Sequence, residues 1–140
     1  MFVDASVLAA IINEEPDAEV FIARMQQGDG PFYISALARF EAVQAAARTS
    51  AERRGERVTG EIIAAATEVV DALIVQLQAR TVAISEEIGS LAIAASREYG
   101  KVVGHPSRLN LGDCFAYACA KSLGMPLLYK GGDFARTDLG

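Results

Sequence analysis

The stretch FYISALARFE, residues 32–41, joins a short strand to a helix. Its first three residues are aromatic or β-branched, and such residues favour a strand that is buried inside a sheet. Ser35 follows, and its hydroxyl can accept a hydrogen bond from the first turn of a helix. The stretch therefore predicts a strand over residues 32–34 and a helix from Ser35 to about Thr49.

The same alternation of short apolar runs and helical patterns extends along the chain in both directions. Further strands are expected at residues 2–4, 81–84 and 126–129. Further helices are expected at residues 6–14, 16–27, 61–78, 85–99 and 109–124. Strands separated by helices are typical of a parallel sheet with helices on both faces. The sequence therefore predicts a single α/β domain over residues 1–140.

Three segments between these elements carry turn or loop residues. Residues 28–31, GDGP, have the composition of a turn, and residues 100–107 form a loop punctuated by glycine and proline. Residues 49–57, TSAERRGER, are polar and charged. They predict a loop or a frayed helix end.

The composition limits the classes of function. Of the 140 residues, 51% are hydrophobic, which is enough for a sizeable core. The net charge of −5 argues against a protein that coats nucleic acid, but it allows an enzyme that grips RNA locally around an acidic metal site. No apolar run reaches the roughly 18 residues of a membrane span. Residues 1–19 lack the basic start of a signal peptide, so we expect a cytoplasmic protein.

Cysteine and histidine offer little for catalysis. Cys114 and Cys119 lie five positions apart on one predicted helix, point in different directions and cannot easily bridge each other. We expect both to be small core residues rather than reactive thiols. The single histidine, His105, lies in the loop-like segment GHPSR. Acid–base or metal chemistry must therefore depend mainly on carboxylates.

Four acids are predicted to lie at one edge of the sheet. Asp4 ends the first strand, and Asp133 follows the last one. Asp113 begins the helix before that last strand, and Glu41 lies in the helix after the second strand. Ligands of such folds bind outside the carboxyl ends of the parallel strands, where these acids are expected to gather.

Helix capping is an alternative explanation for three of the four. Asp4 and Asp133 can each cap a following helix, and Asn110 and Asp113 have the spacing of a capping box. Helices that follow strands all begin at the same edge of the fold, so capping alone predicts clustered acids. Taken singly, each aspartate is more often a cap than a catalytic group.

Glu41 does not fit the capping explanation. It is the seventh residue counted from Ser35, too deep to cap, and it shares a helix face with Leu37. A glutamate on a buried face needs a partner, and no Lys or Arg lies three or four residues away. A divalent cation shared with Asp4 and Asp113 would supply the missing charge. Ligand oxygens without thiolate or imidazole suit Mg²⁺ or Mn²⁺.

A metal site of this kind is suited to the hydrolysis of phosphodiesters. The cation lowers the pKa of bound water and polarises a phosphoryl oxygen. Such a site can hydrolyse phosphodiesters without a histidine.

The same residues carry a family resemblance. Asp4-x-Ser6, then Glu41, then LNLGDCFAYACAK over residues 109–121, then LLYKGGDFARTD over residues 127–138, resemble the PIN-domain ribonucleases. More narrowly, the chain is similar to the toxins of VapBC toxin–antitoxin pairs. The likeness extends over essentially the whole chain, and the last two motifs are the specific ones.

The resemblance implies a three-layer α/β/α sandwich around a parallel sheet of four to five strands. It also implies an endoribonuclease that depends on Mg²⁺ or Mn²⁺. By this resemblance Asp4 and Asp113 bind the metal directly, and the catalytic pocket is completed, through waters or a second ion, by Glu41 and Asp133. Supporting roles are implied for Ser6, Thr137 and Asp138.

The resemblance further implies an RNA substrate, a homodimer and a cognate antitoxin whose tail blocks the site. The predicted helices at residues 16–27 and 61–78 have spare apolar surface that could receive the antitoxin.

Other classes of function remain open. A phosphoacceptor signalling domain also has an acidic pocket on a parallel sheet, but Asp4 has no acidic neighbour and residues 81–85 contain no aspartate to accept a phosphoryl group. A phosphatase with an aspartyl nucleophile would want a second aspartate where Ser6 stands. A non-catalytic binding module with the same fold ranks below the nuclease, because all four acids are present.

Overall fold

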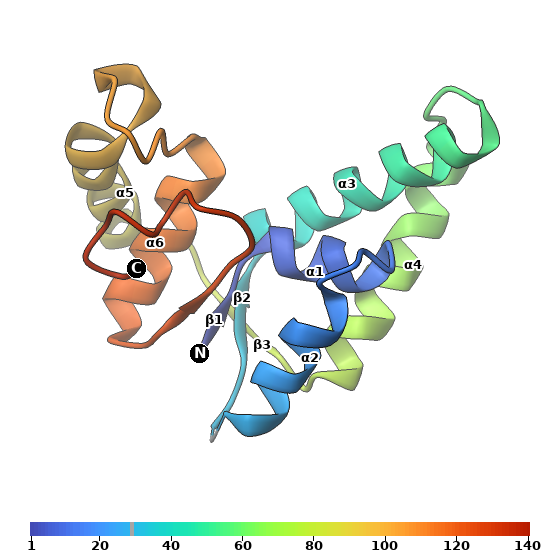
Figure 1. The fold of residues 1–140 in the computed structure, drawn as a ribbon, viewed down its shortest axis with the longest axis horizontal. Coiled ribbons are helices and arrows are strands. Elements are labelled where there is room, and N and C mark those ends of the chain that lie inside the picture. Colours follow the sequence, from blue (N-terminus) through green and yellow to red (C-terminus); the bar gives the residue numbers. More distant parts are fainter. Residues whose placement is uncertain (29) are drawn as a thin grey trace.

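A computed structural model describes residues 1–28 and 30–140 (Figure 1). Its parallel sheet contains β1 (Phe2–Val3), β2 (Tyr33–Ser35), β3 (Arg80–Val82) and β4 (Leu127–Leu128), in the order β3-β2-β1-β4. The first strand in the sequence is therefore central, with Phe2 beside both Tyr33 and Leu127. The turn expected at residues 28–31 includes Asp29, which lies outside the described residues.

Successive strand residues point to opposite faces of the sheet and enter two separate cores. One face carries Val3, Ile34 and Leu128. The other carries Phe2, Tyr33, Val82 and Leu127. Alternation with apolar residues on both sides is the pattern of a sheet covered on both faces.

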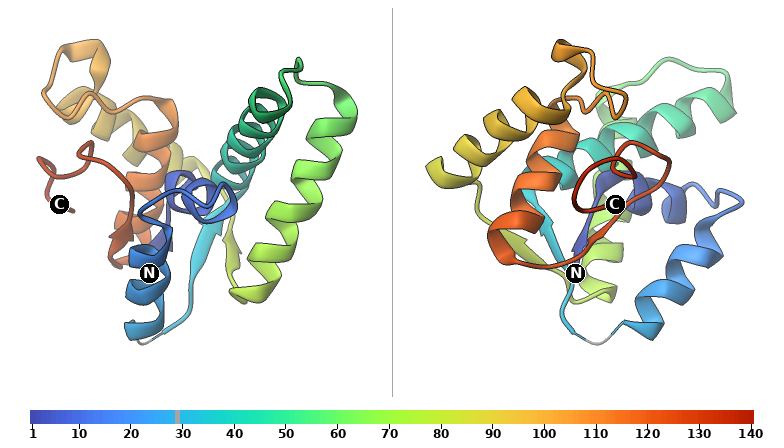
Figure 2. Two further views of the ribbon diagram at one scale, coloured as in Figure 1. Left: turned by 45° about the vertical axis from the view of Figure 1, so that its right-hand side comes forward. Right: turned by 60° about the vertical axis from the view of Figure 1, so that its left-hand side comes forward.

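Helices cover both faces, as Figures 1 and 2 show. The first core is closed by α1 (Ala5–Ile12), α2 (Ala18–Gln27), α3 (Ala36–Arg54) and α4 (Gly60–Gln76). The second is closed by α5 (Glu86–Tyr99) and α6 (Leu111–Leu123), with the short 3₁₀ helix η1 (Lys101–Val103) between them. The predicted α/β/α sandwich is confirmed, with four strands in the part of the chain described.

The helix α3 is longer than its sequence predicts. We expected it to end near Thr49, but it continues to Arg54 and stops at Gly55, where φ is 66°. This left-handed conformation suits a glycine. The polar residues of this segment face water, while Ala51 is buried against the first core. Arg53 anchors the extension by donating to the backbone oxygen of Asn13 at 2.6 Å. Of the two expectations for residues 49–57, the helix end is closer to the structure than the loop, because the buried Ala51 keeps this last turn helical.

The C-terminal tail also differs from expectation. Asp133 was a candidate cap for a short final helix, but the described residues after β4 form turns and bends. Phe134 is buried in the second core and fixes the tail there. That side chain, rather than a helix, holds the segment against the molecule.

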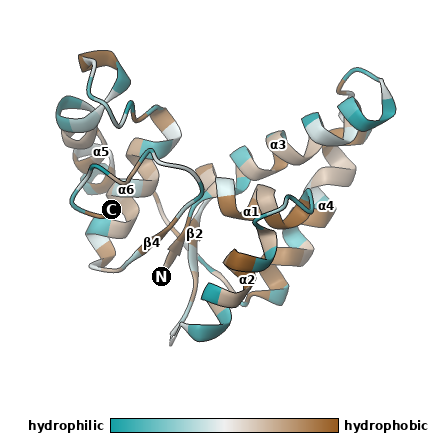
Figure 3. Cartoon of the chain, viewed as in Figure 1, coloured by the Kyte–Doolittle hydropathy of each residue, from teal (hydrophilic) through white to brown (hydrophobic). Residues whose placement is uncertain are grey.

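No helix in residues 1–28 or 30–140 is long and apolar enough to cross a bilayer. The most apolar helix, α1, is short and largely brown in Figure 3. Its Val7, Leu8 and Ala10 are fully buried, so its hydrophobicity serves the core.

Candidate functional site

The four predicted acids come from four different elements that meet where the strands end. Asp4 follows β1, and Glu41 lies in the second turn of α3, which follows β2. Asp113 lies in the first turn of α6, and Asp133 lies in the tail after β4. Since β2 and β4 flank β1 on opposite sides, the chain leaves the sheet in two directions here, which is where open α/β sheets bind ligands.

Asp4 is the most buried of the four acids. It caps α1, and its Oδ2 accepts hydrogen bonds from the backbone N–H of Ser6 at 2.9 Å and from the Ser6 hydroxyl. Burial raises the pKa of the Asp4 carboxyl, and the charge of Asp133 raises it further, while the Ser6 hydrogen bonds lower it. The Ser6 hydroxyl also accepts the backbone N–H of Lys130 at 3.1 Å. Ser6 therefore links Asp4 to the segment after β4.

Glu41 is half-buried, and no lysine or arginine lies three or four residues from it on α3. Arg39 turns away to form a two-pronged ion pair with Asp71, with N···O distances of 2.7 and 2.8 Å. Burial raises the pKa of Glu41 to about 7, with further contributions from the negative charges of Asp4 and Asp113. The prediction that this glutamate has no basic neighbour on α3 to neutralise it agrees with this arrangement.

Asp113 caps its helix and faces the other acids at the same time. Its Oδ2 accepts the backbone N–H of Asn110 at 2.8 Å, and the Asn110 side chain accepts the N–H of Asp113 at 3.0 Å. Together these two hydrogen bonds complete a capping box. Burial raises the pKa of Asp113 to about 6, opposed by the Asn110 hydrogen bond and reinforced by Asp4 and Asp133. Capping and membership of the acidic group are therefore compatible.

Asp133 completes the group from the exposed side. Its carboxylate is at the surface, yet its charge acts on both Asp4 and Asp113. We call Asp4, Glu41, Asp113 and Asp133 the acidic group.

The structure does not bring every predicted site residue into this group. The Asp138 carboxylate accepts a hydrogen bond from Tyr117 at 2.7 Å and pairs with Lys121, both on α6. The Thr137 hydroxyl donates to the backbone oxygen of Phe134 at 2.8 Å. These contacts fix the tail, and a role of Thr137 or Asp138 in orienting a ligand stays a prediction.

The acidic group fits a divalent cation by charge and by donor type. Within residues 1–28 and 30–140, no three His, Cys, Asp or Glu side chains already have the geometry to hold a metal ion, so binding requires carboxylates to turn inward. Burial is the main cause of the raised pKa values of Glu41 and Asp113, and the repulsion between the acids adds to it; a shared cation would relieve that repulsion. Oxygen donors alone suit Mg²⁺ or Mn²⁺.

The sequence did not reveal the contacts of two residues around the acidic group. Gly112 approaches the Glu41 carboxylate so closely that a Cβ there would lie 2.1 Å from its Oε2. Lys130 forms ion pairs with Glu15 and with Asp17, the latter at 2.9 Å, and so ties the end of β4 to the α1–α2 connection. The glycine inside the first turn of α6 is a local signal that could have indicated a close approach.

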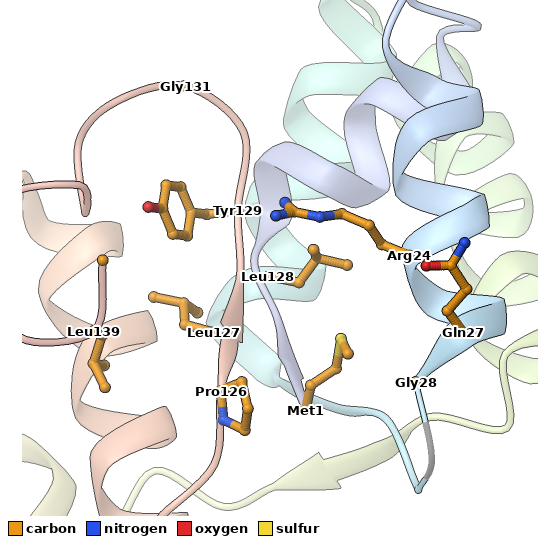
Figure 4. A pocket seen from close by; sticks show the side chains of 11 residues that line it. Met1, Arg24, Gln27, Gly28, Pro126, Leu127, Leu128, Tyr129, Gly131 and Leu139 are labelled. Carbon is orange, nitrogen blue, oxygen red and sulfur yellow. The ribbon is translucent and has the colours of Figure 1, made fainter.

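A cavity of about 520 Å³ lies away from the acidic group, at the free edge of β4 (Figure 4). It is bounded by α2 on one side and the tail on the other, and Figure 4 shows Arg24 reaching toward Tyr129. None of the four acids lines it. This cavity is therefore separate from the acidic group.

The cysteines and the histidine are where the sequence predicted them. Cys114 and Cys119 are free and buried in the second core, and burial raises the pKa of the Cys119 thiol to about 11. His105 lies in its loop, where its Nδ1 accepts the backbone N–H of Ser107 at 3.0 Å and its ring packs against Tyr99. The interpretation of the cysteines as core residues is confirmed.

Comparisons with known proteins agree with the geometry. The sequence model of the family described as "PIN domain" matches residues 1–139. A VapC ribonuclease of Rhizobium meliloti is 49% identical over 140 residues, which cover 99% of each chain. The ribonuclease VapC42 of Mycobacterium tuberculosis is 32% identical over 144 positions, covering 99% of this chain and 96% of that protein.

Two solved structures have a similar fold. Mycobacterium tuberculosis VapC20, described as a toxin that cleaves the sarcin–ricin loop, gives a TM-score of 0.68 at 18% identity and covers 98% of this chain and 94% of its own. A chain from a toxin–antitoxin complex of Klebsiella pneumoniae gives a TM-score of 0.62 at 18% identity, with 98% and 92% covered. At this identity, the structural likeness shows the fold alone.

Proposed function

Because this chain belongs to the PIN-domain family, we propose that it is a metal-dependent endoribonuclease, the toxin of a VapBC-type pair. The observation that carries the proposal is the acidic group itself: four carboxylates from four elements, at the edge of the sheet where ligands bind. The 49% identity to a VapC ribonuclease over the full chain supports the substrate class, RNA. We further propose that residues 1–140 form one domain and act in the cytoplasm.

Each residue of the acidic group has a task in this proposal. Asp4 and Asp113 would hold Mg²⁺ or Mn²⁺, and Glu41 and Asp133 would complete its surroundings. When held there, such an ion would supply Lewis-acid chemistry: a lower pKa for water and a more polarised phosphoryl oxygen of the RNA. Without a bound ion, burial and the neighbouring acids raise the pKa of Glu41 to about 7, and the charge of a cation would favour its ionised form at neutral pH. Ser6 and Asn110 hold Asp4 and Asp113 in place through the hydrogen bonds described above.

The decisive experiment is RNA cleavage by purified, antitoxin-free protein. We expect cleavage with Mg²⁺ or Mn²⁺, none with EDTA, and a loss of at least roughly 100-fold in Asp4→Asn and in Asp113→Asn, because each removes a metal-binding charge. The matched control is Glu68→Gln, which neutralises an exposed acid on α4 outside the acidic group.

Cleavage that survives both active-site substitutions would contradict the proposal and point to a contaminating nuclease. No cleavage of structured or unstructured RNA by any form would favour the non-catalytic binding module instead.

Two apolar surfaces support the proposed protein partners. Between α2 and α4 lies a cavity of about 360 Å³ lined by Ile22, Met25 and Leu77. We assign this cavity to the cognate antitoxin, since apolar grooves between helices receive amphipathic segments.

A separate surface at α5, η1 and α6 exposes Ile93, Val102 and Leu111, with exposed fractions of 74%, 84% and 70%. Exposed apolar clusters of this kind mark protein–protein contacts, and we assign this one to a homodimer.

A further inference from the structure

The backbone conformation at position 112 does not require a glycine. It is the second residue of α6, directly before Asp113, and it is buried. Its φ does not lie in the left-handed region, so an L-residue could adopt the same conformation. Alanine would even favour the helix more. The reason for a glycine at this position must lie outside α6.

The reason is the carboxylate of Glu41, which reaches α6 from α3. A Cβ on residue 112 would lie 2.1 Å from Oε2, 2.4 Å from Oε1 and 2.5 Å from Cδ of Glu41. Real Cβ atoms essentially never approach another heavy atom closer than 3.0 Å. The whole carboxylate of Glu41 therefore occupies the space that any side chain at position 112 would need.

We propose that Gly112 is a positioning residue for Glu41: the missing side chain makes the space that holds the Glu41 carboxylate against the first turn of α6, beside Asp113. The carboxylate is the far end of a flexible side chain, so a methyl group at position 112 would displace it without unfolding the protein. Misplacing a group that supports a metal site typically costs roughly 10- to 100-fold in metal affinity or activity. The consequence for RNA cleavage rests on the proposed function, whereas the displacement of Glu41 does not.

The test is Gly112→Ala in the full chain, with Gly89→Ala as the matched control. Gly89 is also a helical glycine with an ordinary φ, and a Cβ there meets nothing within 4 Å. In metal-free crystals of Gly112→Ala we expect the Glu41 carboxylate to move away from Asp113, since its contact with the new Cβ must open from 2.1 Å to at least 3.0 Å. We expect the thermal midpoint in EDTA to stay the same or to rise by about 3 °C in both variants, because alanine favours a helix over glycine.

Function should separate the two variants. We expect Gly112→Ala to weaken Mn²⁺ binding, measured by calorimetry, and RNA cleavage by roughly 10- to 100-fold each, and Gly89→Ala to change neither. In a Glu41→Ala background, Gly112→Ala should cause no further loss, because the group that it displaces is already gone.

Three results would overturn the inference. One is a Glu41 carboxylate that has not moved in Gly112→Ala. Another is a loss of Mn²⁺ affinity that is the same with and without Glu41. The third is an unfolded Gly112→Ala protein that the shorter side chain of Glu41→Asp does not restore. If wild-type protein does not cleave RNA at all, the proposed function fails, but the crystal structures still decide the position of Glu41.

Discussion

In the metal-free protein, burial and the charges of Asp4 and Asp113 raise the pKa of the Glu41 carboxyl group to about 7. Its usual value is 4.5. Between these two values the folded protein holds a proton that the unfolded chain releases. The free energy of unfolding of the metal-free protein should therefore fall as the pH rises from about 4.5 to about 7.

Glu41→Gln removes this titrating group and should make the decline shallower, leaving the part below about pH 6 that comes from Asp113, whose pKa is also raised. The measurement is the thermal midpoint in EDTA at pH values across that window, for wild type, Glu41→Gln and Glu68→Gln. The last variant changes an exposed glutamate on α4 and should follow the wild type. An identical decline in wild type and Glu41→Gln would show that Glu41 is not held among like charges.

At the scale of the residue, the sequence predicted which acids lie near the carboxyl ends of the strands, but not which residues contact them. Glu41 was identifiable because a glutamate on an apolar helix face has no local partner. The roles of Gly112 and Lys130 depend on residues 71 and 115 positions away in the sequence, Glu41 and Glu15. No pattern within one element contains that information.

At the scale of the element, the first turn of α6 serves both the fold and the site. The capping box between Asn110 and Asp113 satisfies backbone groups that the helix start would otherwise leave unpaired. Substitutions can separate the capping role from the role in the site, because Asp113 is charged and acts on the acidic group, whereas Asn110 is neutral.

We expect one substitution to lower stability and the other to lower RNA cleavage. Asn110→Ala removes the side-chain acceptor and should lower the free energy of unfolding by about 1 kcal/mol, with cleavage changed by less than roughly tenfold. Asp113→Asn keeps an acceptor oxygen and should change stability little, but it should abolish cleavage. The measurements are urea unfolding and RNA cleavage on the same preparations. Equal stability losses in both variants, with cleavage kept in Asp113→Asn, would reduce Asp113 to a helix cap.

Element boundaries were predictable where a cap or a glycine marks them. Ser35 and Ser85 start their helices as expected, and Gly124 ends α6. The end of α3 and the conformation of the tail were not predictable, because Ala51 and Phe134 hold these segments through contacts with distant parts of the chain.

At the scale of the whole molecule, the two cores leave two separate apolar surfaces, one at α2 and α4 and one at α5, η1 and α6. Predicting the fold class and the PIN family from the sequence succeeded because both depend on order along the chain: strands alternating with helices, and four acids in sequence. The assignment of each surface to a partner depends on three-dimensional shape. The sequence predicted the spare apolar surface of residues 16–27 and 61–78, but not the surface at α5, η1 and α6.

The proposed assignment of these surfaces predicts opposite effects of two substitutions. Val102→Asp places a charge on the surface at η1 and should convert dimers to monomers in sedimentation velocity, with antitoxin binding kept. Ile22→Asp changes the cavity between α2 and α4 and should weaken antitoxin binding at least roughly tenfold, with the dimer kept. Dimer dissociation by Ile22→Asp alone would reverse the assignment.

The strand order has a consequence for how this protein is made. The central strand β1 is synthesised first, and its neighbour β4 joins it only after residue 127 has been added. A ribosome adds about 5–20 residues per second, so Asp4 waits on the order of ten seconds for Asp133. A nascent chain therefore cannot contain the complete acidic group until the codon for Asp133 has been translated. Under the proposed function, this order of synthesis delays RNA cleavage until the segment after β4 has been added and β4 has joined the sheet.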